Sequence, residues 1–364
     1  MKRQLLMVLL SVILLSAGWL GVTGLGLLVA FIPLLYISAE AEPTRRGWWR
    51  TFGWATLTFV GWNVATVWWI WNATPVGPIA ATIVSSALNL FAFMLYHTIL
   101  KRGPKPLAYT VLVAAWVATE YWYLEGEVSW PWLVLGNAFA GSIKSIQWYE
   151  YTGVLGGSLW ILLSNVFVLF FLNGVLKKYF NKKINYFLGI ILALPIIISL
   201  TIYFTYEEEK TKGSDVVVVQ PNLDPYEEQY TFSPQMVCQI IEDLTLQKAD
   251  ENTDFVLCPE SCIQEYAWEE YLEETPSIEY LREVSNRFPK LEFIAGMSSR
   301  KRVEESQRTI ATREHKRYGF LYENYNTAIK IDRDTLNPHS QIRHKSVLTP
   351  AVEKMPLQKY LGFM

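Results

Sequence analysis

The first part of the chain contains long apolar runs separated by short charged stretches. Most runs reach the roughly 20 residues that an α-helix needs to cross the hydrocarbon core of a bilayer. Lys2 and Arg3 before the first run also fit a secretory signal, but further runs follow directly and no clean small-residue cleavage site is present. The pattern therefore predicts seven membrane spans, near residues 5–21, 24–39, 52–72, 79–100, 107–124, 153–176 and 185–205.

Two features of this part leave alternatives open. Glu120 lies within or at the edge of the fifth predicted span, where a carboxylate is costly and usually has a partner or a wet cavity. The alternative is that Glu120 sits at the outer interface. The segment 125–152 is apolar but is interrupted by Pro131, Gly136 and Gly141, so it is a poor continuous span. It is expected either in the headgroup region or as the wall of a lipid-binding groove.

After Gly213 the hydrophobic pattern changes to short β-branched runs of the kind found in buried strands. Helical patterns lie between these runs, and strands separated by helices indicate an α/β domain. The predicted strands are 215–220, 254–258, 291–297 and 325–331, and the predicted helices are 233–248 and 277–286.

The charges divide the chain in the same way. Residues 1–206 contain 13 basic and 6 acidic residues, whereas residues 207–364 contain 19 basic and 28 acidic ones. A domain of 206 residues with so few charges would not be soluble. Residues 1–206 are therefore predicted to form a multi-span α-helical membrane bundle. Residues 207–364 have an ordinary soluble composition. Their acidic balance would repel phosphate, so no nucleic-acid partner is expected.

Basic residues in the short loops predict the orientation, because Lys and Arg are retained on the cytoplasmic side. The loops after the second, fourth and sixth spans carry ten of them, against Lys144 alone in the alternate loops. We therefore expect a cytoplasmic N-terminus and, after seven crossings, an outward-facing soluble domain. The ten residues are Arg45, Arg46, Arg50, Lys101, Arg102, Lys105, Lys177, Lys178, Lys182 and Lys183.

One carboxylate of the soluble part occupies a position typical of catalytic groups. Glu260 follows the predicted strand 254–258, and functional residues of α/β domains gather on loops at the carboxyl ends of strands. It is either a general base or a solvated residue that caps the next helix. A metal site at His339 and His344 is poorly supported by the spacing, so we expect neither a metal nor another cofactor. Three cysteines exclude a disulfide scaffold.

Six ordered segments then resemble the apolipoprotein N-acyltransferase family, in the nitrilase or carbon-nitrogen hydrolase superfamily. They are WPWLVLGN (130–137), QWYEYTGVLGGSLW (147–160), VVVQPNLDPY (217–226), DFVLCPES (254–261), YNTAIKI (325–331) and HKSVLTPAVEKMP (344–356). The resemblance implies a bundle of membrane helices joined to an outward-facing, nitrilase-like α-β-β-α sandwich. It also implies the inner (cytoplasmic) membrane of a bacterium, with the soluble domain in the periplasm.

The resemblance further implies acyl transfer in two stages. A cysteine thiolate takes a fatty acyl chain from a phospholipid as a thioester, and then passes it to the N-terminal amino group of a diacylated apolipoprotein. The matched motifs place the general base at Glu260 and the oxyanion-stabilising lysine at Lys345. They place at Glu353 a second carboxylate that orients Lys345.

The chain departs from the family pattern at the nucleophile. The family's cysteine lies downstream of the lysine segment, and none of Cys238, Cys258 and Cys262 occupies its place. Residues 207–364 are also shorter than a complete nitrilase-like domain, and the family's last membrane helix has no counterpart before Met364. We therefore expect a C-terminally incomplete chain that is inactive by itself: a fragment of a longer chain, the product of a truncated gene, or a chain that a second polypeptide completes. The alternatives are a non-catalytic lipid- or lipoprotein-binding remnant and a membrane-tethered amidase of the nitrilase type.

The segment 300–317 is rich in both signs of charge and is predicted to be a solvated connection. In the family, mobile arms over the active site govern lipid entry, and charge alone does not identify this segment as such an arm.

Overall fold

The computed structural model describes residues 1–364 except 73, 127–128, 177–181, 209–211, 225–226, 230, 310, 333–340, 350–352 and 354–364. Lys177, Lys178, His339 and the ends of two family motifs therefore lie outside the described residues. The chain forms two compact units, Met1–Glu208 and Glu209–Met364, each with its own hydrophobic core.

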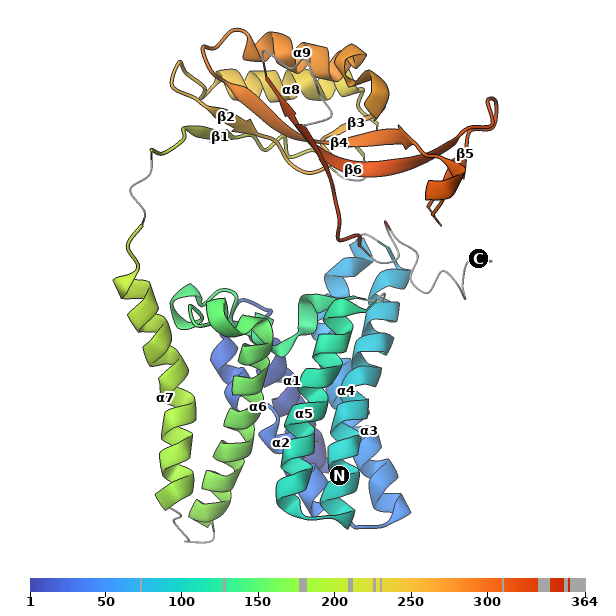
Figure 1. The fold of residues 1–364 in the computed structure, drawn as a ribbon. Coiled ribbons are helices and arrows are strands. Elements are labelled where there is room, and N and C mark those ends of the chain that lie inside the picture. Colours follow the sequence, from blue (N-terminus) through green and yellow to red (C-terminus); the bar gives the residue numbers. More distant parts are fainter. Residues whose placement is uncertain are drawn as a thin grey trace. The chain divides into compact units, whose positions relative to one another are not determined.

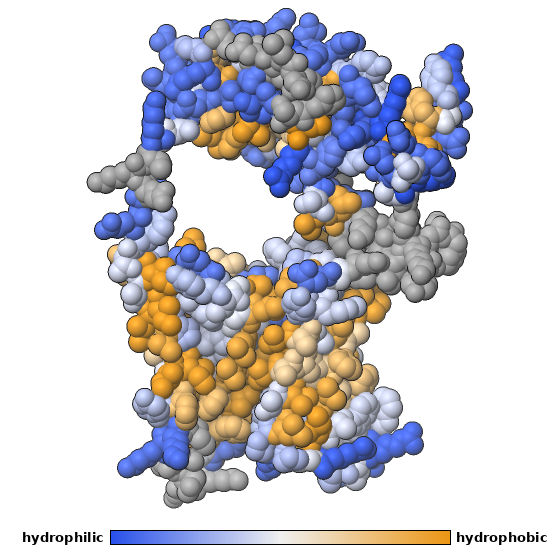
Figure 2. All heavy atoms as spheres, viewed as in Figure 1, coloured by the Kyte–Doolittle hydropathy of each residue, from blue (hydrophilic) through white to orange (hydrophobic). Residues whose placement is uncertain are grey.

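The regular secondary structure of the first unit consists of helices throughout its described residues (Figure 1). Hydrophobic side chains cover the middle of this unit, and hydrophilic ones gather at the lower end in the view of Figure 2. The elements are α1 (Lys2–Ser16), η1 (Gly24–Leu28), α2 (Ile32–Glu40), α3 (Arg45–Val67), η2 (Trp68–Asn72), α4 (Val76–Arg102), α5 (Lys105–Glu125), η3 (Pro131–Leu133), η4 (Leu135–Phe139), η5 (Ile143–Ser145), α6 (Tyr149–Leu176) and α7 (Lys182–Thr205).

Within the part of the chain that the structure describes, three helices are long and apolar enough to cross a membrane: α4, α6 and residues Asn185–Thr205 of α7. The other four predicted spans fall on α1, on η1 with α2, on α3 with η2, and on α5. The total of seven crossings therefore stays a prediction.

The second predicted span is divided between η1 and α2 by a side chain from α6. Asn165 accepts a hydrogen bond from the amide of Phe31 at 2.8 Å and donates one to the carbonyl of Leu27 at 2.7 Å. These contacts satisfy backbone groups that an interrupted helix leaves without partners, inside an apolar core where such groups are costly. The chain can therefore bend here without exposing its backbone to lipid.

Glu120 has partners and is only 7% exposed. Its carboxylate accepts hydrogen bonds from the indole of Trp116 at 3.0 Å and from the amide of Leu135 at 2.9 Å. The second contact joins α5 to η4, in the segment that the sequence left open. A Cβ on Gly136 would lie 2.0 Å from the carbonyl oxygen of Val154 in α6, so glycine allows η4 to pack directly on that helix.

In its described residues, the second unit is a seven-stranded mixed sheet with α8 and α9 over one face (Figure 1). Strands β1, β2 and β4 are parallel, and β6 runs antiparallel to β4. The elements are β1 (Val216–Val218), α8 (Pro234–Leu246), β2 (Phe255–Leu257), β3 (Ile263–Trp268), η6 (Glu269–Glu274), α9 (Pro276–Ser285), β4 (Glu292–Arg302), η7 (Glu305–Gln307), β5 (Arg313–Glu314), β6 (Leu321–Ile331) and β7 (Ile342–His344).

All four predicted strands and both predicted helices of this part are confirmed, with somewhat different ends. Strands β3, β5 and β7 were not predicted. The segment 300–317 was wrongly interpreted as a solvated connection throughout, because β4 continues to Arg302 and residues 313–314 form β5.

Alternation along the central strands gives the sheet two different faces. Phe293, Ala295 and Met297 of β4 point to the helix-covered face, where they are at most 1% exposed. The residues of the other face, which we call the open face, include Val216 and Val218 of β1, which are 43% and 73% exposed. Among the described residues, helices cover only the first of these faces.

Candidate active site

Glu260 lies where two strands succeed one another along the same edge of β4. Strand β2 pairs with the first residues of β4, and β3 pairs with β4 from Met297 onward. The turn between β2 and β3 contains Glu260 and is held by a hydrogen bond from the amide of Gly296 to the carbonyl of Pro259 at 3.2 Å. The pairing along this edge of β4 is interrupted between Ile294 and Met297, and the carboxylate of Glu260 lies at the interruption.

A glycine in β4 allows this turn to approach. A Cβ on Gly296 would lie 2.5 Å from the amide nitrogen of Ser261 and 2.7 Å from the Cα of Glu260. Both are backbone atoms, which do not move aside as a flexible side chain does. Ser261 itself has a φ of 54°, a left-handed conformation that is uncommon for a residue with a side chain.

Lys345 comes from the opposite side of β6. It directly follows β7, and its amide donates a hydrogen bond to the carbonyl of Asn326 in β6 at 2.8 Å. Directly opposed residues of an antiparallel pair project on the same face, so Lys345 shares the open face with Asn326. The preceding residue, His344, projects on the helix-covered face, where its Nε2 lies 2.7 Å from the buried carboxylate of Glu269.

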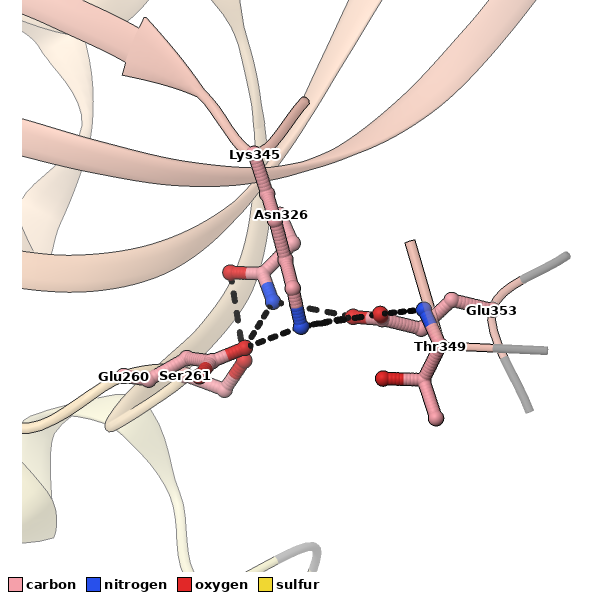
Figure 3. A network of polar contacts seen from close by, with 6 residues as sticks. All are labelled: Glu260, Ser261, Asn326, Lys345, Thr349 and Glu353. Atoms are coloured by element: carbon pink, nitrogen blue, oxygen red, sulfur yellow. Dashed lines mark hydrogen bonds and ion pairs between the residues drawn. The ribbon is translucent and has the colours of Figure 1, made fainter. Parts of the chain in front are cut away.

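The charged groups of these segments meet in one cluster (Figure 3). The ammonium of Lys345 lies 2.9 Å from Oε1 of Glu260 and 2.9 Å from Oε2 of Glu353. The side-chain amide of Asn326 donates to the same two carboxylates, at 2.5 Å to Glu260 and 3.1 Å to Glu353. The amide of Thr349 donates to Glu353 at 2.8 Å. One ammonium and one amide thus join two carboxylates that are 93 residues apart in the sequence.

The contacts in the cluster shift the pKa values of Glu353 and Lys345. Partial burial by itself would raise the pKa of Glu353, but hydrogen bonds from Lys345, Thr349 and Asn326 outweigh it and hold the pKa at about 2. The hydrogen bond to Glu353, with that to Glu260, raises the pKa of Lys345 above its ordinary value against the opposite effect of burial. Lys345 is therefore an ammonium and Glu353 a carboxylate at neutral pH. Glu260 is the most accessible of the three, with 61% of its side chain exposed.

Two of the three cysteines, Cys238 and Cys262, are buried, whereas Cys258 is half-buried. Cys262, two residues after Glu260, is 4% exposed and its thiol donates to the carbonyl of Gly296 at 3.2 Å. Cys238 is a buried residue of α8, and burial raises the pKa of its thiol to about 11. Among the described residues, no group of three or more His, Cys, Asp and Glu side chains has the arrangement of a metal site.

The structure brings together the three residues that the motifs identified, and their catalytic roles stay predictions. It adds Asn326, which the sequence analysis quoted within YNTAIKI but did not select. An amide carries no charge, so composition gave no signal for it. Only its place opposite Lys345, at the middle of the longest pair of strands, shows that it bridges both carboxylates.

Two comparisons with known proteins match this chain. The model of the apolipoprotein N-acyltransferase N-terminal domain matches residues 6–167. The apolipoprotein N-acyltransferase of Chlorobaculum tepidum is 27% identical over 246 residues, which are 65% of this chain and 44% of that relative. The chain thus spans less than half the length of the curated relative that it matches. By its helical unit and by this alignment, the chain is similar to the apolipoprotein N-acyltransferase family.

Proposed function

We propose that the protein transfers a fatty acyl chain from a phospholipid to the N-terminal amino group of a lipid-modified cysteine in apolipoproteins, through a thioester acyl-enzyme. The observation that supports it most is the cluster of Glu260, Lys345, Glu353 and Asn326 on a sheet of a chain that is similar to this family. The C. tepidum relative carries that name. The nucleophilic thiol in this proposal is none of Cys238, Cys258 and Cys262.

In the first stage, Glu260 accepts the proton of the nucleophilic thiol, and the thiolate attacks the ester carbonyl of the phospholipid. The ammonium of Lys345 stabilises the oxyanion of the tetrahedral intermediate. When the intermediate breaks down, the ester C–O bond is cleaved and Glu260 returns the proton to the departing alcohol, which leaves as a lysophospholipid. The thioester remains on the enzyme.

In the second stage, the amino group of the apolipoprotein attacks the thioester carbonyl. Glu260 accepts a proton from that nitrogen, and Lys345 again stabilises the oxyanion. The C–S bond breaks as the amide forms, and the thiolate is regenerated and reprotonated from Glu260. Glu353 and Asn326 act on the reaction by holding Lys345 and Glu260 in register.

We further propose that the protein lies in a bacterial inner membrane, with its N-terminus in the cytoplasm and the second unit in the periplasm. Ten basic residues in alternate loops against one support this orientation. A soluble domain held at the periplasmic surface of the inner membrane meets both lipid substrates as they diffuse in that bilayer.

The test uses the full-length protein in detergent with a phospholipid donor and a diacylated lipopeptide acceptor, and mass spectrometry to detect both thioester and product. Glu260→Gln is expected to lower the rate by about 10²–10⁴-fold, the usual contribution of a general base. Lys345→Met is expected to lower it by about 10²–10³-fold, the usual loss of an oxyanion donor.

A matched control exists on the same sheet. Lys330 and Glu292 form an ion pair of the same kind at 2.9 Å, away from the cluster. Lys330→Met and Glu292→Gln should leave the rate within about threefold, since surface ion pairs contribute little. Full activity in Glu260→Gln would refute its role. Hydrolysis of amides without acyl transfer would favour the amidase, and a wild-type protein that binds both lipids but forms no thioester would favour the binding remnant.

A further inference from the structure

Arg300 of β4 lies on the same face of the sheet as the cluster, one step farther along the strands. In the register of β4 and β6, Ser298 opposes Asn326 and Arg300 opposes Asn324. Two residues of extended strand span about 7 Å and return to the same face. Arg300 is thus displaced from Asn326 by about that distance, toward Tyr322 and away from β7.

Aromatic rings rather than carboxylates hold the Arg300 guanidinium. Its Cζ lies 4.8 Å from the ring centroid of Tyr266, 5.9 Å from that of Trp268 and 5.8 Å from that of Tyr322. Its Nε donates to the side-chain oxygen of Asn324 at 3.3 Å. Within the described part of the chain, Arg300 forms no ion pair, and its two terminal nitrogens have no hydrogen-bond partner.

Arg302, two residues on and on the same face, repeats the arrangement. Its guanidinium lies 4.5 Å from the ring centroid of Phe320 and 5.8 Å from that of Trp268. Only its backbone amide contacts a carboxylate, that of Glu270 at 3.1 Å, and no described residue forms an ion pair with its side chain. Arg282 and Arg287 of the same unit, in contrast, are each bound to a glutamate.

The guanidinium groups of Arg300 and Arg302 are held by aromatic rings and have no carboxylate partner among the described residues. They are therefore suited to bind an anionic ligand such as a carboxylate or a phosphate. A guanidinium offers parallel N–H groups that match a phosphate, and its stacking on rings fixes its orientation before the ligand arrives. The surrounding Tyr and Trp rings suit a lipid interface, because each combines an apolar body with a polar atom.

We propose that Arg300, supported by Arg302, binds the phosphate of the phospholipid acyl donor while the donor's ester lies at Glu260 and Lys345. This inference rests on the proposed function, since it assigns a place to that reaction's donor. A glycerol backbone separates the ester carbonyl of such a lipid from its phosphate, a span of the same order as the about 7 Å between Asn326 and Arg300 along the strand.

The experiment measures binding to the full-length protein in detergent, with two probes that acyl transfer does not cleave. One is a diether phosphatidylethanolamine and the other is the matching diether glycerol, which has no phosphate. Arg300→Gln should weaken binding of the diether phospholipid by about tenfold or more, because a charge-assisted hydrogen bond is lost, and should leave binding of the diether glycerol unchanged.

Lys301→Gln is the matched control, because Lys301 is the adjacent cation and projects on the other face of β4. It should bind both probes as the wild type does. Arg300→Lys keeps the charge but loses the planar fork, so its affinity for the phospholipid should be intermediate. If Arg300→Gln fails to fold, this second variant still decides the matter, and wild-type affinity in Arg300→Lys would overturn the proposal.

Equal weakening for both probes in Arg300→Gln would mean that the arginine only maintains the fold, and would also overturn it. Inorganic phosphate should compete weakly; if it binds as tightly as the diether phospholipid, the site is a general anion site and not a lipid site. Acyl transfer is assayed separately. If the wild type forms no thioester but Arg300→Gln still weakens phospholipid binding, the proposed function alone is refuted. If the wild type transfers the acyl chain but Arg300→Gln binds the phospholipid as the wild type does, this inference alone is refuted.

Discussion

The pKa of Glu353 is lowered by its neighbours in the cluster. Glu353 receives hydrogen bonds from an ammonium, a backbone amide and a side-chain amide, and they hold its pKa at about 2. It flanks Lys345 on the side away from Glu260, so that the ammonium is shared between two carboxylates. The position of Lys345 is therefore determined by both.

Glu353→Gln is expected to remove a stabilisation that depends on pH. A carboxyl whose pKa is lowered on folding from 4.5 to about 2 stabilises the folded state above pH 4.5, and this contribution is lost as the pH falls through about 2. The difference in unfolding free energy between wild type and variant should be constant at neutral pH, at about 1–3 kcal/mol for this partly buried pair.

That difference should shrink on acidification and vanish near pH 2. Thermal unfolding of the detergent-solubilised protein between pH 2 and 8, followed by tryptophan fluorescence, measures it. Glu251→Gln, a change at an exposed carboxylate outside the cluster, is the control. A difference between wild type and Glu353→Gln that does not change with pH would contradict this account.

At the residue scale, the sequence predicted the charged members of the site and missed the neutral one. Glu260 was recognisable because it follows a buried run, and Lys345 and Glu353 because they match a family motif. Asn326 was not, because its function as a bridge exists only after β6 pairs with both β4 and β7. Arg300 and Arg302 were likewise missed, because they lie in the segment that was predicted to be a solvated connection. Their aromatic partners are as many as 34 residues away in the sequence.

At the scale of elements, the site depends on how closely a turn approaches a strand. Gly296→Ala places a methyl group within 2.7 Å of backbone atoms of Pro259, Glu260 and Ser261. Either β4 or the turn must move, at a cost of about 1–3 kcal/mol, which is typical of overpacking. We expect a lower melting temperature and, because Glu260 is displaced from Lys345, a loss of activity of more than about tenfold.

Gly213→Ala is the control for that substitution, because no atom lies within 4 Å of its added Cβ. It should change neither quantity appreciably. An active, stable Gly296→Ala protein would show that the turn adapts without moving Glu260, and that the close approach is not what positions the carboxylate.

The elements that were missed have physical reasons too. The last residues of β4, SSRKR, are polar and basic, and they form a strand by pairing with β6 and β3, not through an apolar pattern. Strand β3 begins after a turn that contains a proline and a glutamate, and it contains a bulge near Tyr266, whose φ is 53°.

At the scale of the whole molecule, the charge asymmetry of the loops predicts the side of the membrane on which each part lies. A periplasm-dependent phosphatase fused after Gly213 should be active, whereas the same enzyme fused after Arg102, in a predicted cytoplasmic loop, should be inactive. A reporter that is active only in the cytoplasm, fused at the same two positions, should give the opposite pattern. Activity of the phosphatase at Arg102 and not at Gly213 would reverse the proposed orientation.

The open face of the sheet has a consequence for the origin of the rest of the site. Its apolar residues Val216 and Val218 remain exposed, and Asn326 and Lys345 project from this same face. A second layer that buries these valines would lie against the same face of the sheet from which the cluster projects. Burial of the sheet and delivery of a nucleophile to Glu260 would then be a single event, so that the catalytic group and the stability of the fold would be acquired together.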